Sequence, residues 1–202
     1  MKLRGRALIL ALLLWAAPVV AVAAEWPDVL PLVKKSTVEI ASSAGACTGF
    51  VIDNEKDLVL TAAHCDGPKD TLFADNLKAE VKAKDDKNDL MVLYVKDIDR
   101  PALKLAQRDP MVGQEVASFG WGYAMQEPLF RVAHISAKNV ALERAHYVAI
   151  DASFVPGQSG GPVVDKDGNV VMVVQLGNSI SGFGVGAEIL EDKVGRFFEK
   201  AK

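Results

Sequence analysis

Short apolar runs that end in turn residues make up the first half of the chain, a pattern that predicts β-strands. The run Lys78–Lys84 alternates between apolar and polar residues and therefore predicts a half-exposed strand. Leu90–Val95 is apolar throughout, which predicts a strand buried on both sides. The other strands expected here are Thr37–Ala41, Thr48–Ile52 and Leu58–Ala62.

A second series of short runs follows, and it ends in a segment with a different period. The turn Asp165–Asn169 predicts a hairpin between two of its strands. After the last strand, apolar residues recur at helical spacing at Leu190, Val194, Phe197 and Phe198, which predicts a short C-terminal amphipathic helix. The strands expected in this half are Val116–Phe119, Leu129–His134, Tyr147–Asp151, Gly161–Val164, Val170–Leu176 and Gly182–Ile189.

A polar, proline-marked connection from Asp97 to Met111 divides the two series of strands. This division predicts an all-β protein made of two packed six-stranded antiparallel β-barrels. The first barrel is expected in residues 25–100, and the second barrel with the C-terminal helix in residues 101–202. A single larger sandwich is the alternative fold.

The N-terminal segment has the layout of a secretory signal peptide. Basic residues at Lys2, Arg4 and Arg6 precede the apolar run Ala7–Trp15, and small residues lead to Ala24. We therefore expect residues 1–24 to be removed and the mature protein to be exported, to the periplasm or outside the cell. An uncleaved membrane anchor is the alternative, because the apolar stretch nears the length that spans a bilayer. Contact with a membrane is expected only in that case.

The net charge and the numbers of cysteines and histidines indicate which partners and cofactors are not expected. The chain has a formal charge of −3, which becomes −6 without the three basic residues of the signal segment. No cluster of Lys and Arg follows, so neither nucleic acid nor an anionic membrane surface is an expected partner. Cys47 and Cys65 predict one disulfide in an exported chain, with two free thiols as the alternative. The three histidines lack zinc-site spacing, and neither a metal nor another cofactor is expected.

A serine between glycines, in Gly157–Pro162 (Gly-Gln-Ser-Gly-Gly-Pro), is the strongest local signal of chemistry. Such a turn exposes the Ser159 hydroxyl and directs backbone N–H groups into one small space. The N–H groups of Gly157 and Ser159 are the expected oxyanion hole, because they would bind the oxygen that becomes negative when a carbonyl is attacked. An ordinary glycine turn is the alternative interpretation.

Two further residues fit the chemistry that Ser159 requires. His64 follows an apolar strand, although a lone histidine there is more often structural than catalytic. Asp89 directly precedes the buried strand, and a partly buried carboxylate needs a hydrogen-bond partner, which His64 would provide. Asp85 and Asp86 lie in the adjacent polar turn and are the competing carboxylates.

These motifs resemble those of the trypsin-like serine protease superfamily. Thr61–Cys65 (Thr-Ala-Ala-His-Cys), the Asp89 strand and Gly157–Pro162 occur in the superfamily's order of His, Asp and Ser. The stretch Asp151–Ser159 is more similar to the protease domain of the HtrA/Deg group. The resemblance is to that protease domain alone, and a PDZ domain is not expected. The similarity extends from about Gly45 to Ile189 and implies a chymotrypsin-like fold with His64, Asp89 and Ser159 as the catalytic triad.

The resemblance also implies a function and a specificity. We expect an exported serine endopeptidase that cleaves protein or peptide substrates through an acyl-enzyme. Ser153 would form the floor of the specificity pocket, with Gly177 and Gly184 in its walls. An uncharged floor favours apolar side chains before the cut, because it cannot neutralise a buried lysine or arginine. The alternatives are a catalytically silent binding protein of the same fold, and an esterase, which the absence of α/β-hydrolase patterning disfavours.

Overall fold

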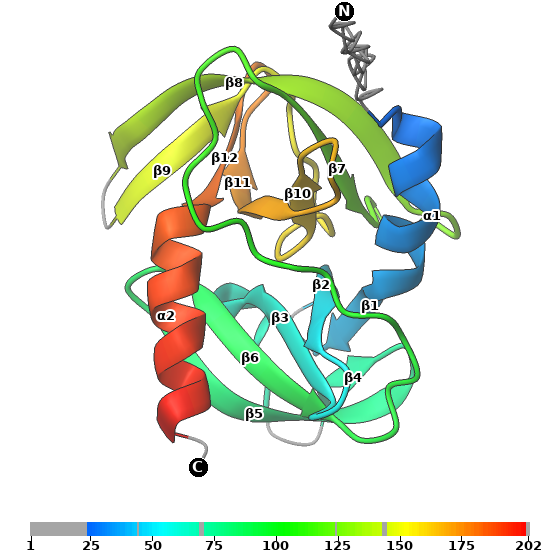
Figure 1. Cartoon of the computed structure of the whole chain (residues 1–202). Coiled ribbons are helices and arrows are strands. Elements are labelled where there is room, and N and C mark those ends of the chain that lie inside the picture. Colours follow the sequence, from blue (N-terminus) through cyan, green and yellow to red (C-terminus); the bar gives the residue numbers. More distant parts are fainter. Residues whose placement is uncertain (1–23, 44, 69–70, 124, 143–144, 201–202) are drawn as a thin grey trace, which may run out of the picture.

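Two closed barrels of six antiparallel strands each form the computed structural model of the chain, which confirms the predicted fold class (Figure 1). The structure describes residues 24–43, 45–68, 71–123, 125–142 and 145–200. Of the expected signal segment, only Ala24 lies within these residues. The first barrel contains β1 (Thr37–Ser42), β2 (Gly45–Asp53), β3 (Leu58–Ala62), β4 (Phe73–Ala74), β5 (Leu77–Asp85) and β6 (Leu90–Val95). The second contains β7 (Glu115–Gly120), β8 (Leu129–Leu142), β9 (Ala145–Ile150), β10 (Pro162–Val164), β11 (Val170–Gly177) and β12 (Gly182–Gly186).

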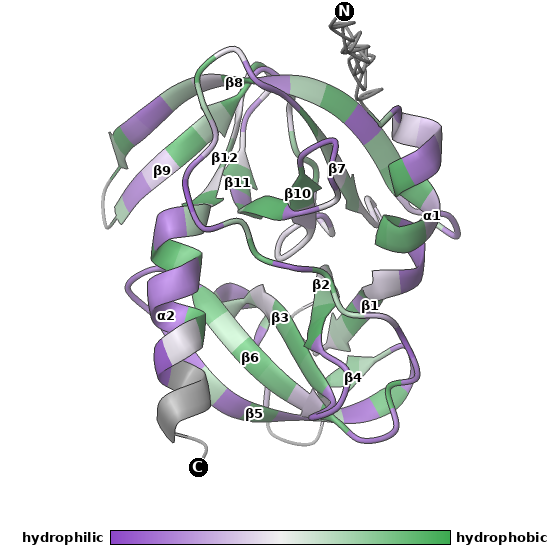
Figure 2. Ribbon diagram, viewed as in Figure 1, coloured by the Kyte–Doolittle hydropathy of each residue, from purple (hydrophilic) through white to green (hydrophobic). Residues whose placement is uncertain are grey.

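Three apolar cores hold this arrangement together. One fills the first barrel around Ile40, Val59 and Leu93, and another fills the second barrel around Ile135 and Met172. The third core lies between the barrels and takes residues from both, including Phe50, Leu60, Phe119 and Val173. Because both faces of β6 are buried, its sequence is apolar throughout, as the sequence analysis expected; Figure 2 shows this apolar strand beside β3.

An N-terminal helix, α1 (Trp26–Ser36), precedes the first barrel and was not predicted. Its two prolines obscure the helical pattern, but Pro27 lies in the first turn, where no backbone N–H is required. Val29 and Val33 join the core between the barrels, and the Trp26 ring nitrogen donates to Glu115 of β7 at 2.9 Å. The helix therefore packs against the second barrel although it precedes the first in the sequence.

The C-terminal helix was predicted, but its start was placed too late. The strand expected at Gly182–Ile189 ends at Gly186, and α2 runs from Ala187 to Lys200. The apolar sequence around this junction fits either element, whereas the structure shows the Asp109 carboxylate accepting from the Glu188 N–H at 3.0 Å, near the helix N-terminus. Leu190 and Val194 pack into the core between the barrels, and the visible face of α2 is largely hydrophilic (Figure 2). The side chains of Phe197 and Phe198 lie outside the described part of the chain.

Two other elements differ from expectation. The strand β4 was missed because two residues carry too little pattern, and β8 continues eight residues beyond the predicted His134, to Leu142. This extension pairs with β9, and its last residue, Leu142, lines a cavity together with His64 and Lys84 of the first barrel. Among the described residues, none of the helices is long and apolar enough to cross a bilayer.

Candidate active site

The first barrel brings His64 and Asp89 together by placing each beside the end of a paired strand. His64 follows β3 in a single 3-10 turn, and Asp89 precedes β6, which pairs with β3. The Asp89 backbone has φ +53°, a conformation that residues other than glycine adopt rarely. Its carbonyl accepts from the Ala63 N–H at 3.0 Å, so the two segments are held together by backbone as well as side chains.

The Asp89 carboxylate binds His64 through both of its oxygens. Oδ2 lies 2.6 Å from the ring Nδ1, and Oδ1 accepts from the His64 backbone N–H at 2.8 Å. Two bonds from one carboxylate fix the position and the ring orientation of the histidine. With Nδ1 as the donor, the proton-free Nε2 faces away from Asp89, which is the tautomer required of a general base.

The competing carboxylates have other partners. Asp85 accepts from the Asn88 side chain at 2.8 Å and from the backbone N–H groups of Lys87 and Asn88, which stabilises the turn before Asp89. Burial alone would raise the pKa of Asp85, but these hydrogen bonds and the Lys193 ammonium together hold it below its usual value. Asp86 is 83% exposed and pairs with Lys84 at 3.5 Å.

Ser159 lies in the second barrel, on the turn between β9 and β10 that faces the first barrel. Gly160 has φ +81°, and a Cβ at this position would lie 2.3 Å from both the Thr48 carbonyl oxygen and the Thr61 hydroxyl. Only glycine allows so close an approach between the two barrels. The Thr48 N–H then donates to the Ser159 carbonyl at 2.8 Å, which fixes the serine backbone against β2.

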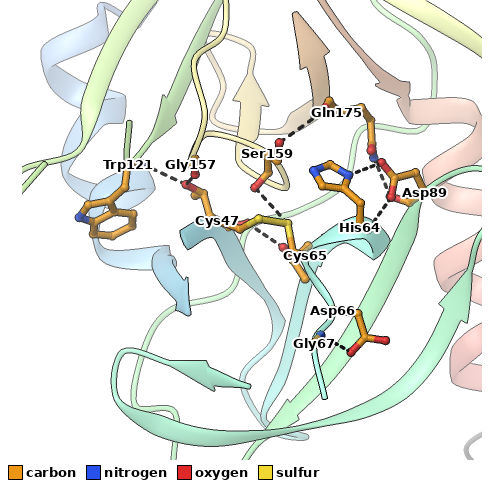
Figure 3. The surroundings of a disulfide bond; sticks show 12 residues. Cys47, His64, Cys65, Asp66, Gly67, Asp89, Trp121, Gly157, Ser159 and Gln175 are labelled. Carbon is orange, nitrogen blue, oxygen red and sulfur yellow. Dashed lines mark hydrogen bonds and ion pairs between the residues drawn. A yellow bond between two sulfur atoms is a disulfide. The ribbon is translucent and has the colours of Figure 1, made fainter. Parts of the chain in front are cut away.

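The Ser159 hydroxyl does not bond to His64 in this structure. It donates to the Gln175 carbonyl oxygen at 3.3 Å, while the Gln175 side-chain amide donates to the Asp89 carbonyl at 2.8 Å. Figure 3 shows the His64 ring between Ser159 and Asp89, with Gln175 above all three. A hydrogen bond from Ser159 to His64 therefore requires rotation of the serine side chain away from Gln175.

The expected oxyanion hole has its N–H groups available. Neither Gly157 nor Ser159 donates its backbone N–H to another residue that the structure describes. The Thr48 hydroxyl donates to the Gly157 carbonyl at 2.8 Å and accepts from the Trp121 N–H at 3.0 Å. Because Thr48 holds that carbonyl, it also limits the orientation of the turn that carries the two N–H groups.

Sequence analysis identified neither Thr48 nor Gln175 as a functional residue. Both are almost fully buried polar residues within apolar strands, β2 and β11. A polar residue at a buried strand position must find a hydrogen-bond partner. The occurrence of a polar residue within an apolar run is therefore the signal in the sequence that points to Thr48 and Gln175. Their partners lie on other segments, so the sequence does not reveal what they bind.

Cys47 and Cys65 form a disulfide that joins β2 to the turn carrying His64. With His64 they also form the only cluster of metal-type donor atoms found within the described ranges, all within 4.8 Å of one another. Disulfide sulfur is not a thiolate, and thiolate is the form of cysteine that binds metal. As a disulfide, the cysteine pair therefore braces the turn that carries His64.

Replacement of both cysteines by serine is expected to lower the free energy of unfolding by about 3 kcal/mol, because the disulfide closes a loop across a separation of 18 residues. Chemical denaturation of the wild type and of the Cys47→Ser/Cys65→Ser variant measures the difference. Adding reductant to the wild type should reproduce most of the loss and leave the double variant unchanged. An unchanged denaturation midpoint in both cases would contradict the prediction.

Asp151 begins the segment that runs from the end of β9 to Ser159, and its side chain anchors that segment to β8. Its carboxylate accepts from the backbone N–H of His134 at 2.6 Å and lies 3.3 Å from the ring Nδ1 of the same residue. The backbone hydrogen bond is the main reason that the pKa of Asp151 lies below its usual value. This contact ties the segment to β8 at the opposite end from Ser159.

Of the residues expected to line the specificity pocket, Gly177 lies beside Phe154, the residue that follows Ser153. A Cβ on Gly177 would lie 2.8 Å from the Phe154 nitrogen, and one on Gly182 would lie 2.4 Å from the Phe154 ring. At Gly184, a Cβ would instead meet the Val173 carbonyl on the neighbouring strand. Within the described part of the chain, two cavities that adjoin His64 are not lined by Ser153, Gly177 or Gly184.

The surroundings of Ser153 carry a positive charge. Arg131 of β8 donates through Nη1 to the Ser153 carbonyl at 2.7 Å and lies 3.3 Å from its hydroxyl. A guanidinium at this position repels a second cation. The structure thus adds an electrostatic reason to expect no lysine or arginine side chain at this pocket.

The two barrels and the His64–Asp89 pair beside a glycine-bounded serine define a chymotrypsin-like fold of the serine protease type. Comparison with protein families agrees: residues 47–173 match the trypsin-like peptidase domain. The chain belongs to this family.

Its curated relatives include bacterial proteins of the DegP type. A probable periplasmic serine endoprotease of Halomonas elongata is 35% identical over 133 residues, which cover 61% of this chain and 28% of that protein. A protein of the same description from Hahella chejuensis is 31% identical over 140 residues, covering 65% of this chain and 29% of its own length. The chain thus spans less than a third of these relatives.

Solved structures with the same fold include the active form of the Rv3671c protease from M. tuberculosis. It has a TM-score of 0.73 and 24% identity, and the alignment covers 95% of this chain and 94% of that one. A serine endoprotease from Yersinia pestis also has a TM-score of 0.73, at 20% identity, over 90% of this chain and 69% of its own. These similarities support the fold.

Proposed function

We propose that this protein is an exported serine endopeptidase that hydrolyses peptide bonds through an acyl-enzyme, with His64, Asp89 and Ser159 as the triad. The observation that carries the proposal is the two-bond contact from Asp89 to His64 beside a serine with free neighbouring N–H groups. Membership of the trypsin-like peptidase family supports the same chemistry, and the periplasmic descriptions of the DegP-like relatives support export.

In the proposed mechanism, Ser159 attacks the peptide carbonyl while its proton passes to His64 Nε2. The hydroxyl must first leave the Gln175 carbonyl, a rotation about one side-chain bond. Asp89 keeps Nδ1 protonated and stabilises the imidazolium, and the Gly157 and Ser159 N–H groups bind the oxyanion. His64 then protonates the leaving amine, and water completes the cycle by the same steps.

A fluorophosphonate probe tests the proposal directly, because it reacts only with an activated serine. We expect it to label the mature protein at one site, mapped by mass spectrometry to Ser159, and we expect the protein to cleave an unfolded protein substrate. Absence of both labelling and cleavage would favour a silent binding protein. Labelling with hydrolysis of esters but not of peptides would favour the esterase.

The position of Phe154 refines the expected specificity from apolar to small apolar side chains before the cut. Phe154 is only 9% exposed and occupies the space beside Gly177 and Gly182, so we expect cleavage after alanine-sized residues. Phe154→Ala should raise kcat/KM for a peptide with leucine or phenylalanine at that position by about 10-fold or more, because each methylene accommodated contributes roughly that factor.

Cleavage after alanine in the same variant is the internal control and should change much less. Phe154→Leu, which retains most of the apolar volume, separates an effect on specificity from loss of stability in the core of the second barrel. Efficient cleavage after arginine by the wild type would contradict the expected specificity, since both the apolar pocket and Arg131 oppose it.

A further inference from the structure

Thr48 is a completely buried polar residue of the first barrel whose hydrogen bonds reach the turn that carries Ser159. Its hydroxyl donates to the Gly157 carbonyl at 2.8 Å, and its backbone N–H donates to the Ser159 carbonyl at 2.8 Å. One residue of β2 therefore holds two carbonyls of the second barrel. These carbonyls belong to the same two residues whose N–H groups form the proposed oxyanion hole.

Gly157 lies between two peptide units, and each of them is held through its carbonyl oxygen. The Pro156 carbonyl shares a peptide unit with the Gly157 N–H, and it accepts from the Tyr123 N–H at 2.8 Å. The Gly157 carbonyl, in the next peptide unit, accepts from the Thr48 hydroxyl. Gly157 has φ +102°, a backbone region that glycine enters and leaves easily. The direction of its N–H therefore depends on these two hydrogen bonds.

The Thr48 hydroxyl is itself fixed in position. The Trp121 N–H donates to it at 3.0 Å, so its own proton is directed to the Gly157 carbonyl. Figure 3 shows Trp121 and Gly157 beside each other, on the far side of Ser159 from Asp89. A Cβ on Gly120 would lie 2.8 Å from the hydroxyl oxygen, and threonine has few allowed side-chain rotamers. The hydroxyl thus forms a stiff link between the end of β7 and the Ser159 turn.

We infer that Thr48 is a positioning residue of the oxyanion hole, whose hydroxyl keeps the Gly157 N–H directed at the oxygen that becomes negative when Ser159 attacks. The inference rests on the proposed endopeptidase function, because only that reaction forms the oxyanion. A misdirected donor loses its bond to the oxyanion and leaves the binding of the uncharged substrate largely unchanged. Thr48 is completely buried, so it acts through the turn and not by contact with the substrate.

Thr48→Val tests this role, because valine keeps the shape and the backbone N–H of threonine and replaces the hydroxyl by a methyl group. We expect kcat for peptide hydrolysis to fall by about 10- to 100-fold, which is less than the loss of an oxyanion donor itself. KM should change by less than about 2-fold, because the lost interaction belongs to the transition state. Rates are expressed per mole of Ser159 that fluorophosphonate labels to completion, so unfolded protein does not contribute.

A peptide aldehyde gives a readout that a purely structural role would not change. The Ser159 oxygen adds to the aldehyde carbon, the carbonyl electron pair moves to the aldehyde oxygen, and the serine proton passes to His64. That oxygen occupies the oxyanion hole, so the inhibition constant Ki of the aldehyde should rise in Thr48→Val by the same factor as kcat/KM falls. The corresponding peptide alcohol cannot form this adduct and should bind the wild type and the variant equally.

Two variants serve as controls. Thr48→Ser restores the hydroxyl and should recover most of the lost activity. Thr37→Val is the matched control, because Thr37 is also completely buried and its hydroxyl donates to the Val33 carbonyl at 2.7 Å, where α1 meets β1. It removes a buried hydrogen bond of the same kind and should leave kcat and the aldehyde Ki unchanged. Thr48→Ala, which adds no methyl group against the Gly157 carbonyl, takes the place of Thr48→Val if that variant does not fold.

The inference is overturned if the variants without the Thr48 hydroxyl keep the wild-type kcat, or if kcat falls while the aldehyde Ki does not change. An equal loss of kcat in Thr37→Val would also overturn it. A labelled, active wild type with an unaffected Thr48→Val would retain the endopeptidase function and lose the role of Thr48. A wild type that neither reacts with fluorophosphonate nor cleaves peptides would lose the endopeptidase function, and the role of Thr48 with it.

Discussion

Replacement of Ser159 by alanine is expected to lower kcat for an unfolded protein substrate by on the order of 10⁶-fold, because no other group can form the acyl-enzyme. The substitution removes one hydroxyl that, among the described residues, bonds only to the Gln175 carbonyl, so the fold should remain intact. The measurement is the rate of new amino termini released from the substrate, with the fluorophosphonate signal as a second readout.

Ser181→Ala is the matched control for this experiment, since Ser181 lies in the loop between β11 and β12 and its substitution should have no effect on labelling. Near-wild-type thermal unfolding of Ser159→Ala would show that lost activity is not lost structure. If the Ser159→Ala variant kept both cleavage and labelling, the nucleophile would have to be another residue.

Asp89→Asn is expected to lower kcat by about 10⁴-fold, the second largest effect. The asparagine oxygen can still accept from the His64 backbone N–H, as Asp89 Oδ1 does at 2.8 Å. The asparagine NH₂ group would then face Nδ1, where Asp89 Oδ2 now lies at 2.6 Å. An amide N–H donates, so it would favour the tautomer with the proton on Nε2, and that tautomer cannot accept the serine proton.

The kinetic signature separates this role from a structural one. Asp89→Asn should lower kcat far more than it changes KM. Asp99→Asn, which removes a charge from an exposed position beyond β6, should behave as the wild type. If Asp85→Asn lost more activity than Asp89→Asn, the carboxylate assigned to His64 would be the wrong one.

Strand patterning predicted the two-barrel fold because apolar runs and turn residues are local properties. The prediction of individual elements failed where one local pattern is compatible with both a strand and a helix. Residues 187–189 are apolar enough for a strand but are helical, because Asp109, distant in sequence, accepts from the Glu188 N–H. The prolines of α1 obscured a helix whose stability comes from Val29 and Val33 in the core between the barrels.

The sequence by itself determined the fold class and the chemical types at the site. A few adjacent residues are enough to identify each local feature of the site, namely the His64 turn, the Asp89 strand and the glycines around Ser159. Only the tertiary structure decided which groups meet: that Asp89 rather than Asp85 binds His64, that Gln175 holds the Ser159 hydroxyl, and that the Phe154 ring lies against Gly182. Contacts between distant segments depend on packing in three dimensions, which local sequence patterns do not encode.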